Sequence, residues 1–168
     1  MGKLLLDCLL LKRDAYEHVE EHSGYTYYAL AVILVTSFTG AFRISIVEGQ
    51  PFSLGYVLLS LSFWVALTGV AFALGTTLMK SKETHATFGQ MWRTLGIAQL
   101  PALFYLFILV VPLIGIAVFV WQSYTTVLAI QTALDYPKML KAVAVYIISA
   151  VTSLVFVALL FAVLGISV

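Results

Sequence analysis

Residues 94–134 form one apolar stretch, TLGIAQLPALFYLFILVVPLIGIAVFVWQSYTTVLAIQTAL, that contains no Lys, Arg, Asp or Glu. Its 41 residues are twice the ~20 that one helix needs to cross the hydrocarbon core of a bilayer. Near its centre lies Val111-Pro112-Leu113-Ile114-Gly115, and a proline followed closely by a glycine favours a tight turn. The stretch therefore predicts a hairpin of two membrane-spanning helices, over about 94–112 and 113–134.

Three further stretches of the chain are long and apolar enough for one span each. They lie at about 25–46, 52–79 and 139–167. Across the whole chain 62% of the residues are hydrophobic and 10% are charged, whereas a soluble domain carries about 25% charged residues. We therefore predict an all-α fold, a polytopic membrane bundle of five transmembrane helices over residues 25–168, preceded by a short segment of residues 1–24.

The orientation of the bundle follows from its basic residues, since Lys and Arg concentrate in cytoplasmic loops. With five spans, eight basic residues fall on one side of the membrane and only Arg43 falls on the other. The eight are Lys3, Lys12, Arg13, Lys80, Lys82, Arg93, Lys138 and Lys141. We therefore expect a multi-pass protein of the cell (inner, cytoplasmic) membrane, with its N-terminus in the cytoplasm and its C-terminus outside.

Residues 3–22 have the pattern of a single amphipathic helix. The charged residues share one side of this helix, and the other side is apolar, formed by Leu4, Cys8, Leu11, Ala15 and Val19. This pattern is typical of a helix that lies in the membrane interface. A helix that packs under the bundle would show the same pattern, so the sequence leaves both arrangements open.

The same segment contains His18-Val19-Glu20-Glu21-His22, which matches the H-x-x-E-H pattern of one class of zinc peptidases. On a helix the two histidines lie four residues apart, so both could bind one metal. Such enzymes also need a third ligand and a substrate cleft from a large soluble domain. We therefore interpret the motif as a solvated polar face and predict no catalytic residue, cofactor or metal site, with metal binding by His18, Glu21 and His22 as a remote alternative.

Polar residues concentrate at the middle of the predicted hairpin and form what we call the polar band. Its members are Gln99, Pro101, Trp121, Gln122, Tyr124, Thr125, Thr126 and Gln131. Lipid offers such groups no hydrogen-bond partner, so they must find partners inside the protein. The band is interpreted either as interhelical hydrogen bonds, which we favour, or as the lining of a small cavity. Pro101 itself should kink its span and free the carbonyl of Ile97.

The second span has small residues on one helix face, which we call the packing stripe. Its members are Gly55, Ser62, Ala66, Gly69, Ala73 and Thr76. Small residues let membrane helices approach closely, and the simplest interpretation is that the stripe forms internal contacts of the bundle. Apart from Arg43 near the outer end of the first span, no Asp, Glu, His, Lys or Arg lies well inside a span, which argues against ion-coupled transport but not against passive conduction.

The chain resembles the Yip-domain family, five-span membrane proteins named for their interaction with Ypt/Rab GTPases. The likeness begins with Leu10-Leu11-Lys12-Arg13-Asp14-Ala15-Tyr16-Glu17-His18-Val19-Glu20, which is similar to the opening of short prokaryotic members. It continues through Thr87-Phe88-Gly89-Gln90, Leu95-Gly96-Ile97-Ala98-Gln99-Leu100-Pro101, Val111–Gly115, Trp121 and Lys138–Lys141. The resemblance implies a helical bundle with a trafficking-like part in membrane organisation. It implies no established reaction.

The residues and the resemblance together lead to two functional hypotheses. The first is a non-enzymatic protein that organises membranes or acts as a membrane adaptor through helix packing, lipid contact and self-association. Its partners would be membrane lipids, a second copy of the chain and another membrane protein, and not nucleic acid. The alternative is a passive channel, a small-solute permease or a lipid translocator that uses a polar cavity in the middle of the bundle.

Overall fold

The computed structural model describes residues 2–109 and 113–164, and every regular element among them is helical. The elements in chain order are α1 (Gly2–Leu9), α2 (Arg13–Glu21), α3 (Tyr25–Glu48), α4 (Leu54–Thr76), α5 (Phe88–Ile97), the 3₁₀ helix η1 (Leu100–Leu109), α6 (Ile114–Ala133) and α7 (Met139–Leu164). The all-α prediction is confirmed for these residues.

Four of these helices are long and apolar enough to cross a membrane: α3, α4, α6 and α7. They coincide with four of the five predicted spans. The third predicted span, 94–112, is not one membrane-length helix, and that part of the prediction is wrong. Its first four residues are the end of α5, residues 100–109 are η1, and residues 110–112, which include Pro112, lie outside the described residues.

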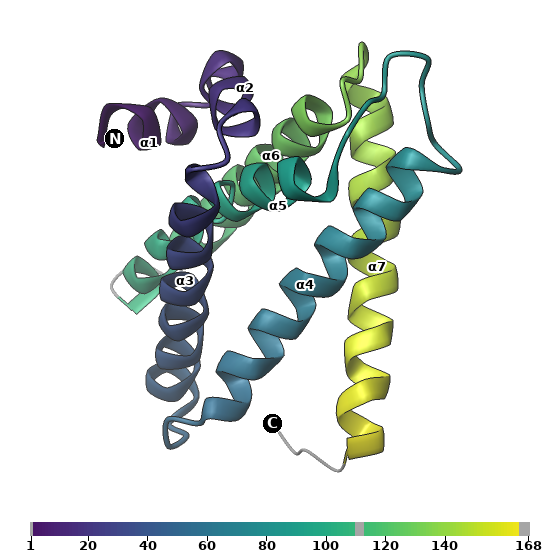
Figure 1. The fold of residues 1–168 in the computed structure, drawn as a ribbon. Helices are drawn as coiled ribbons and strands as arrows, with labels where there is room; N and C mark the ends of the chain where they lie inside the picture. The colour runs from purple at the N-terminus through teal and green to yellow at the C-terminus, as the bar shows by residue number, and fades with distance from the viewer. Residues whose placement is uncertain (1, 110–112, 165–168) are drawn as a thin grey trace.

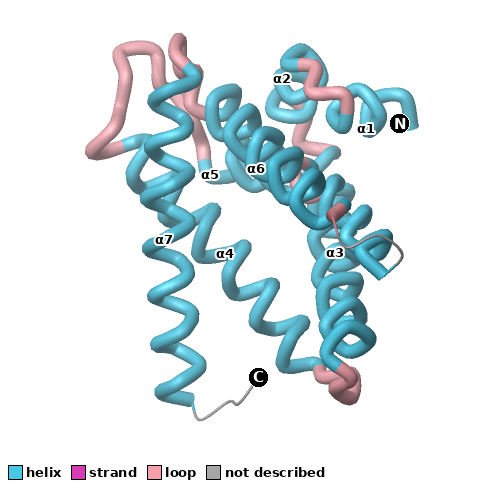
Figure 2. Tube along the Cα trace, turned by 180° about the vertical axis from the view of Figure 1, so that it is seen from behind, coloured by secondary structure: helices cyan, strands magenta, loops and turns pink. Residues whose placement is uncertain are grey.

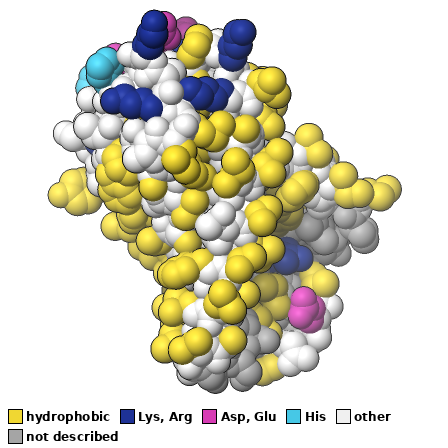
Figure 3. All heavy atoms as spheres, turned by 90° about the vertical axis from the view of Figure 1, so that its right-hand side faces the viewer, with side chains coloured by type: hydrophobic (Ala, Val, Ile, Leu, Met, Phe, Trp, Pro, Cys, Tyr) yellow, Lys and Arg dark blue, Asp and Glu magenta, His cyan; other side chains and the backbone are white. Residues whose placement is uncertain are grey.

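The long helices are arranged around α4, which runs obliquely between α3 and α7 (Figure 1). It packs against both of them. The chain from α5 through η1 returns along α6 (Figures 1 and 2). α5 and η1 pack against α3, while α6 packs against α5, η1 and α7. Lys and Arg side chains gather at the end of the molecule that carries α1 and α2, while the body is mostly hydrophobic (Figure 3).

The N-terminal segment is two helices and not the single one that we predicted for residues 3–22. The chain turns between α1 and α2 at Leu11, whose φ of 63° lies in the left-handed region, where a helix cannot continue. Cys8, Tyr16 and Val19 are fully or almost fully buried in the main core cluster. Of the two arrangements left open, the structure shows the one in which this segment packs under the bundle.

The helices α5 and α3 approach each other closely where they cross. A Cβ atom built on Gly96 would lie 2.7 Å from the Cβ of Ala29 and 3.0 Å from the Cδ1 of Ile33. Both distances are shorter than van der Waals contact allows. Gly96 is therefore the residue that lets the two backbones meet, as small residues do at membrane helix interfaces.

We expect Gly96→Ala to reduce the unfolding free energy by about 1–3 kcal/mol, the usual cost of overpacking a core. Gly40→Ala, also within a helix, is the matched control, because a Cβ atom there meets nothing within 4 Å. It should leave stability unchanged or raise it by up to about 1 kcal/mol through helix propensity. Unfolding in mixed detergent micelles measures both variants, and equal values for the two would contradict this account of the contact.

Candidate functional site

The polar band is centred on one backbone carbonyl, that of Ala98, at the junction of α5 and η1. In a 3₁₀ helix each carbonyl accepts from the N–H three residues ahead, which for Ala98 would be that of Pro101. Proline has no N–H. The Ala98 carbonyl instead accepts hydrogen bonds from Gln122 Nε2 and Thr125 Oγ1 of α6, each at 3.0 Å.

Pro101 is predicted to free the carbonyl of Ile97, and the structure adds that the carbonyl of Ala98 is bonded by side chains of α6. That prediction assumed α-helical bonds from i to i−4, whereas the chain adopts the shorter i to i−3 spacing here, as in the bond from the Ala102 N–H to the Gln99 carbonyl. The helix is broken rather than kinked, since α5 ends at Ile97 and η1 begins at Leu100. The side-chain carbonyl of Gln99 also accepts from Gln122 Nε2, at 3.0 Å.

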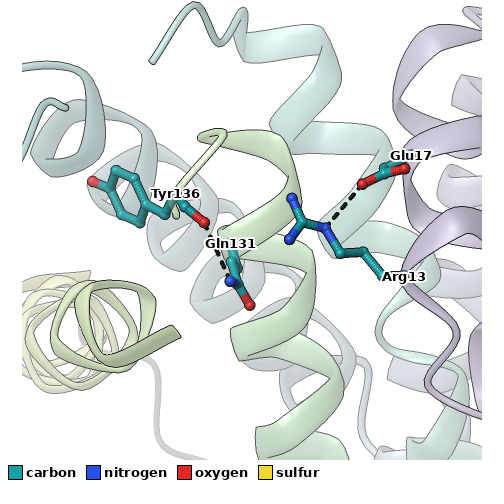
Figure 4. Close-up of polar contacts among 4 residues, drawn as sticks. All are labelled: Arg13, Glu17, Gln131 and Tyr136. Atoms are coloured by element: carbon teal, nitrogen blue, oxygen red, sulfur yellow. Dashed lines mark hydrogen bonds and ion pairs between the residues drawn. The ribbon is translucent and has the colours of Figure 1, made fainter. Parts of the chain in front are cut away.

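The remaining members of the band do not converge on a common point. Trp121 Nε1 donates to the Leu9 carbonyl at 3.0 Å and so connects α6 to the end of α1. Thr126 donates only within its own helix, to the Gln122 carbonyl. Gln131 Nε2 donates to the Tyr136 carbonyl in the loop after α6 (Figure 4). Tyr124 is 44% exposed on the outer surface, so most of the band consists of structural hydrogen bonds.

One small polar cavity does lie beside the band. It has a volume of about 60 Å³ and is lined in part by Ser37, Ser60, Trp64 and Gln99. The Trp64 indole N–H is buried and has no hydrogen-bond partner in the described part of the chain. A water molecule occupies about 30 Å³ in the liquid, so this cavity has room for about two waters. It is too small for a larger solute.

A second polar cluster joins α2 to α5 at the basic end of the molecule. The guanidinium group of Arg93 donates to the carbonyls of Val19 and Glu20, which lie at the C-terminal end of α2. Gln90 Nε2 donates to Glu20 Oε1 at 2.9 Å. Gln90 is also the last residue of the capping box that begins at Thr87. Sequence reasoning placed Arg93 only among the loop charges and missed this cluster, because its partner groups are 70 residues or more away.

The electrostatics of this cluster act chiefly on Glu20. Burial, with the negative charge of Asp135 next, raises the pKa of Glu20 from 4.5 to about 7. Arg93 lowers the pKa but does not outweigh these effects. A carboxyl group with a raised pKa holds its proton in the folded state, so it stabilises the fold most below its unfolded pKa and loses this contribution as the pH rises towards 7.

The histidine motif forms a stacked aromatic group at the surface of α2. The rings of His18 and His22 lie 4.2 Å apart between centroids. His22 Nδ1 contacts the His18 carbonyl, and His18 Nε2 contacts the Tyr25 hydroxyl, at 2.9 and 3.2 Å. Within the described residues no group of three or more His, Cys, Asp or Glu side chains is placed to hold a metal ion.

Earlier on the same helix, Arg13 and Glu17 form an exposed ion pair at 2.9 Å (Figure 4). Such exposed pairs one helical turn apart contribute only about 0.3–0.5 kcal/mol. This pair therefore adds little to the docking of α2, which rests on the buried side chains and on the Arg93 contacts.

The packing stripe of α4 does not form internal contacts, and that interpretation is wrong. The face that α4 buries carries Val57, Trp64, Leu67, Thr68, Ala71 and Gly75. The stripe residues are partly or, at Ala73, largely exposed, and a Cβ atom on Gly69 would meet nothing within 4 Å. Both faces of α4 thus carry small residues, and the face that the fold buries is not the one with the packing stripe.

Comparison with known proteins gives one match. The family model for the Yip1 domain matches residues 7–161. No curated protein and no solved structure matches the chain. The matched range runs from α1 into α7 and includes both polar clusters.

We expect Gln122→Leu and Thr125→Val each to lower the unfolding free energy by roughly 0.6 kcal/mol, a typical value for hydrogen bonds between membrane helices. The double variant should cost more than the sum, because it leaves the Ala98 carbonyl unpaired at about 1–3 kcal/mol. Thr126→Val is the matched control, since its hydroxyl bonds within its own helix. A double-mutant cycle in mixed micelles measures the coupling, and strict additivity would contradict the shared-carbonyl account.

Proposed function

Because this chain belongs to the Yip1 domain family and is a multi-pass membrane protein, we propose that it organises membranes as a non-enzymatic protein. Proteins of the family are generally non-enzymatic membrane trafficking proteins. In this proposal the chain acts through helix packing, lipid contact and self-association. Lipids and further copies of the chain are its main partners, with another membrane protein as an additional one.

The observation that carries this proposal is the exposed packing stripe of α4. Gly69 and Ala66 lie on a helix face that the chain's own core does not use. In a bilayer a shallow small-residue face lets a second helix approach closely, and dispersion together with lipid entropy then favours association. The side chains of Trp121, Gln122 and Thr125 donate hydrogen bonds from α6 to other elements, which supports a structural over a chemical role for these residues.

The channel, permease or translocator alternative has less support. The Gln122 amide N–H groups are engaged by Ala98 and Gln99. The polar cavity beside them measures about 60 Å³, while sites for small molecules usually measure about 300–1,000 Å³. We therefore keep passive conduction only as the alternative outcome of flux measurements on liposomes.

The proposal also includes five membrane crossings, with α5 and η1 together making the third. Ten α-helical and ten 3₁₀ residues extend about 35 Å, while the hydrocarbon core is about 30 Å thick. The basic end then faces the cytoplasm of the cell (inner) membrane, as the distribution of Lys and Arg favours. Arg43 and Glu48 lie on the outer side, and the C-terminus lies there too.

Cysteine labelling with a membrane-impermeant maleimide on intact cells tests these crossings. We expect Glu48→Cys and Leu113→Cys to react from outside, since both positions are exposed. Lys82→Cys should react only after permeabilisation. The native Cys8 provides the background, because burial raises the pKa of its thiol to about 12 and the thiolate is the reactive form. Failure of Leu113→Cys to react from outside would show that the hairpin does not cross.

Self-association is tested by energy transfer between labelled copies in liposomes of varied protein-to-lipid ratio. We expect Ala66→Leu and Gly69→Leu to weaken the dimer by about tenfold, because a large side chain keeps the helices apart. Val65→Leu is the matched control, since Val65 is exposed on the same helix but outside the packing stripe. A protein that stays monomeric at every ratio, or variants that match the control, would refute the proposal.

A further inference from the structure

A cavity of about 400 Å³ lies between α3, α4 and α7, near the end of the bundle that carries the α3–α4 loop. At this end α3 and α7 stand apart, and among the described helices α4 lies between them (Figures 1 and 2). Gly40 lines the cavity, and a Cβ atom there would meet nothing within 4 Å. The packing of the described residues therefore leaves this space open.

The lining of this cavity combines apolar and polar side chains. The apolar ones include Phe63, Leu154 and Val157, and the polar ones are Arg43, Tyr56 and Ser60. Tyr56 lies in the first turn of α4, at the same end of the bundle as Arg43. Apolar walls disfavour water and favour hydrocarbon. The volume lies within the range of ligand pockets, about 300–1,000 Å³, and a ligand with an apolar body and a polar head suits this lining.

Arg43 gives the site its charge. It is the one basic residue of the long apolar helices away from the basic end, and α3 continues for five more residues to Glu48, about 8 Å further along the axis. This distance places the guanidinium group near the level of lipid headgroups. In the described part of the chain no hydrogen bond or ion pair is made by Arg43, and no acidic side chain lines the cavity. A charge at this depth is costly without a partner.

We propose that this cavity binds one acyl chain of an anionic phospholipid and that Arg43 binds the phosphate group of the same lipid. A guanidinium group matches phosphate oxygens with two parallel hydrogen bonds. The lining offers a cation and no carboxylate, so a net negative headgroup is favoured over one that carries its own ammonium group. The hydroxyl of Tyr56 is a further donor at the same level. This site goes beyond the proposed self-association and does not depend on it.

Lipid retention by the intact purified protein tests the proposal. The protein is exchanged into mixed micelles that contain equal amounts of phosphatidylglycerol and phosphatidylcholine with the same acyl chains, and native mass spectrometry then counts retained lipids. We expect one tightly retained phosphatidylglycerol per chain, with a preference of about tenfold over phosphatidylcholine. Arg43→Gln should abolish the preference, and Arg43→Lys should restore part of it, since a cation remains.

Two further variants separate the charge from the cavity. Gly40→Leu fills the apolar space and should reduce retention of both lipids, while Lys82→Gln removes a basic residue at the opposite end and should change nothing. Added phosphatidylglycerol should raise the melting temperature of the wild type and of Lys82→Gln, but not of Arg43→Gln. Equal retention of the two lipids by the wild type, or an unchanged preference in Arg43→Gln, would overturn the proposal. So would a cross-link between Ala158→Cys residues of two copies, because a second chain would then occupy the cavity.

Discussion

The bundle depends on the rule that a backbone carbonyl inside a bilayer must have a hydrogen-bond donor within the protein. Pro101 withdraws the donor that the Ala98 carbonyl would otherwise have, and α6 replaces it with Gln122 and Thr125. The packing of α6 against α5 and η1 is therefore fixed in register by two polar side chains as well as by apolar contact. Without them the broken helix would carry an unpaired carbonyl into the interior of the bundle.

The same principle accounts for the difference between the two ends of the molecule. At the basic end, side chains bond to backbone groups of other elements: Trp121 to the Leu9 carbonyl, Arg93 to the end of α2, and Tyr136 to the Met79 carbonyl at 2.7 Å. These hydrogen bonds hold the short helices and loops against the core. At the opposite end α7 stands apart from α3 and the start of α4 (Figure 1), which leaves the cavity beside Arg43. The molecule thus combines a firmly connected end with an end that is open to lipid.

The two ends of the molecule differ in the surfaces that they offer to partners. A non-enzymatic membrane protein has only its surfaces and its shape with which to influence its surroundings. The packing stripe of α4 offers a surface for another helix, and the cavity between α3, α4 and α7 offers one for a lipid. Because α4 contributes to both, lipid binding and self-association would involve different faces of one helix. Glu20, whose pKa is raised to about 7 by burial, lies at the far end and belongs to the connected core.

The sequence by itself determined the membrane character, four of the long helices and the family, because hydropathy, length and local motifs act within short segments. It indicated that Pro101 would interrupt its helix and free the carbonyl of Ile97, but not that Ala98 would be the residue whose carbonyl the side chains of α6 bind. Only the tertiary structure decided that the side chains of α6 bind the Ala98 carbonyl and that the N-terminal segment breaks at Leu11. It also decided that Arg93 contacts Glu20 and that the packing stripe is exposed. Each of these depends on how helices distant in sequence cross, and a stripe of small residues looks the same in the sequence whether the fold buries it or leaves it at the surface.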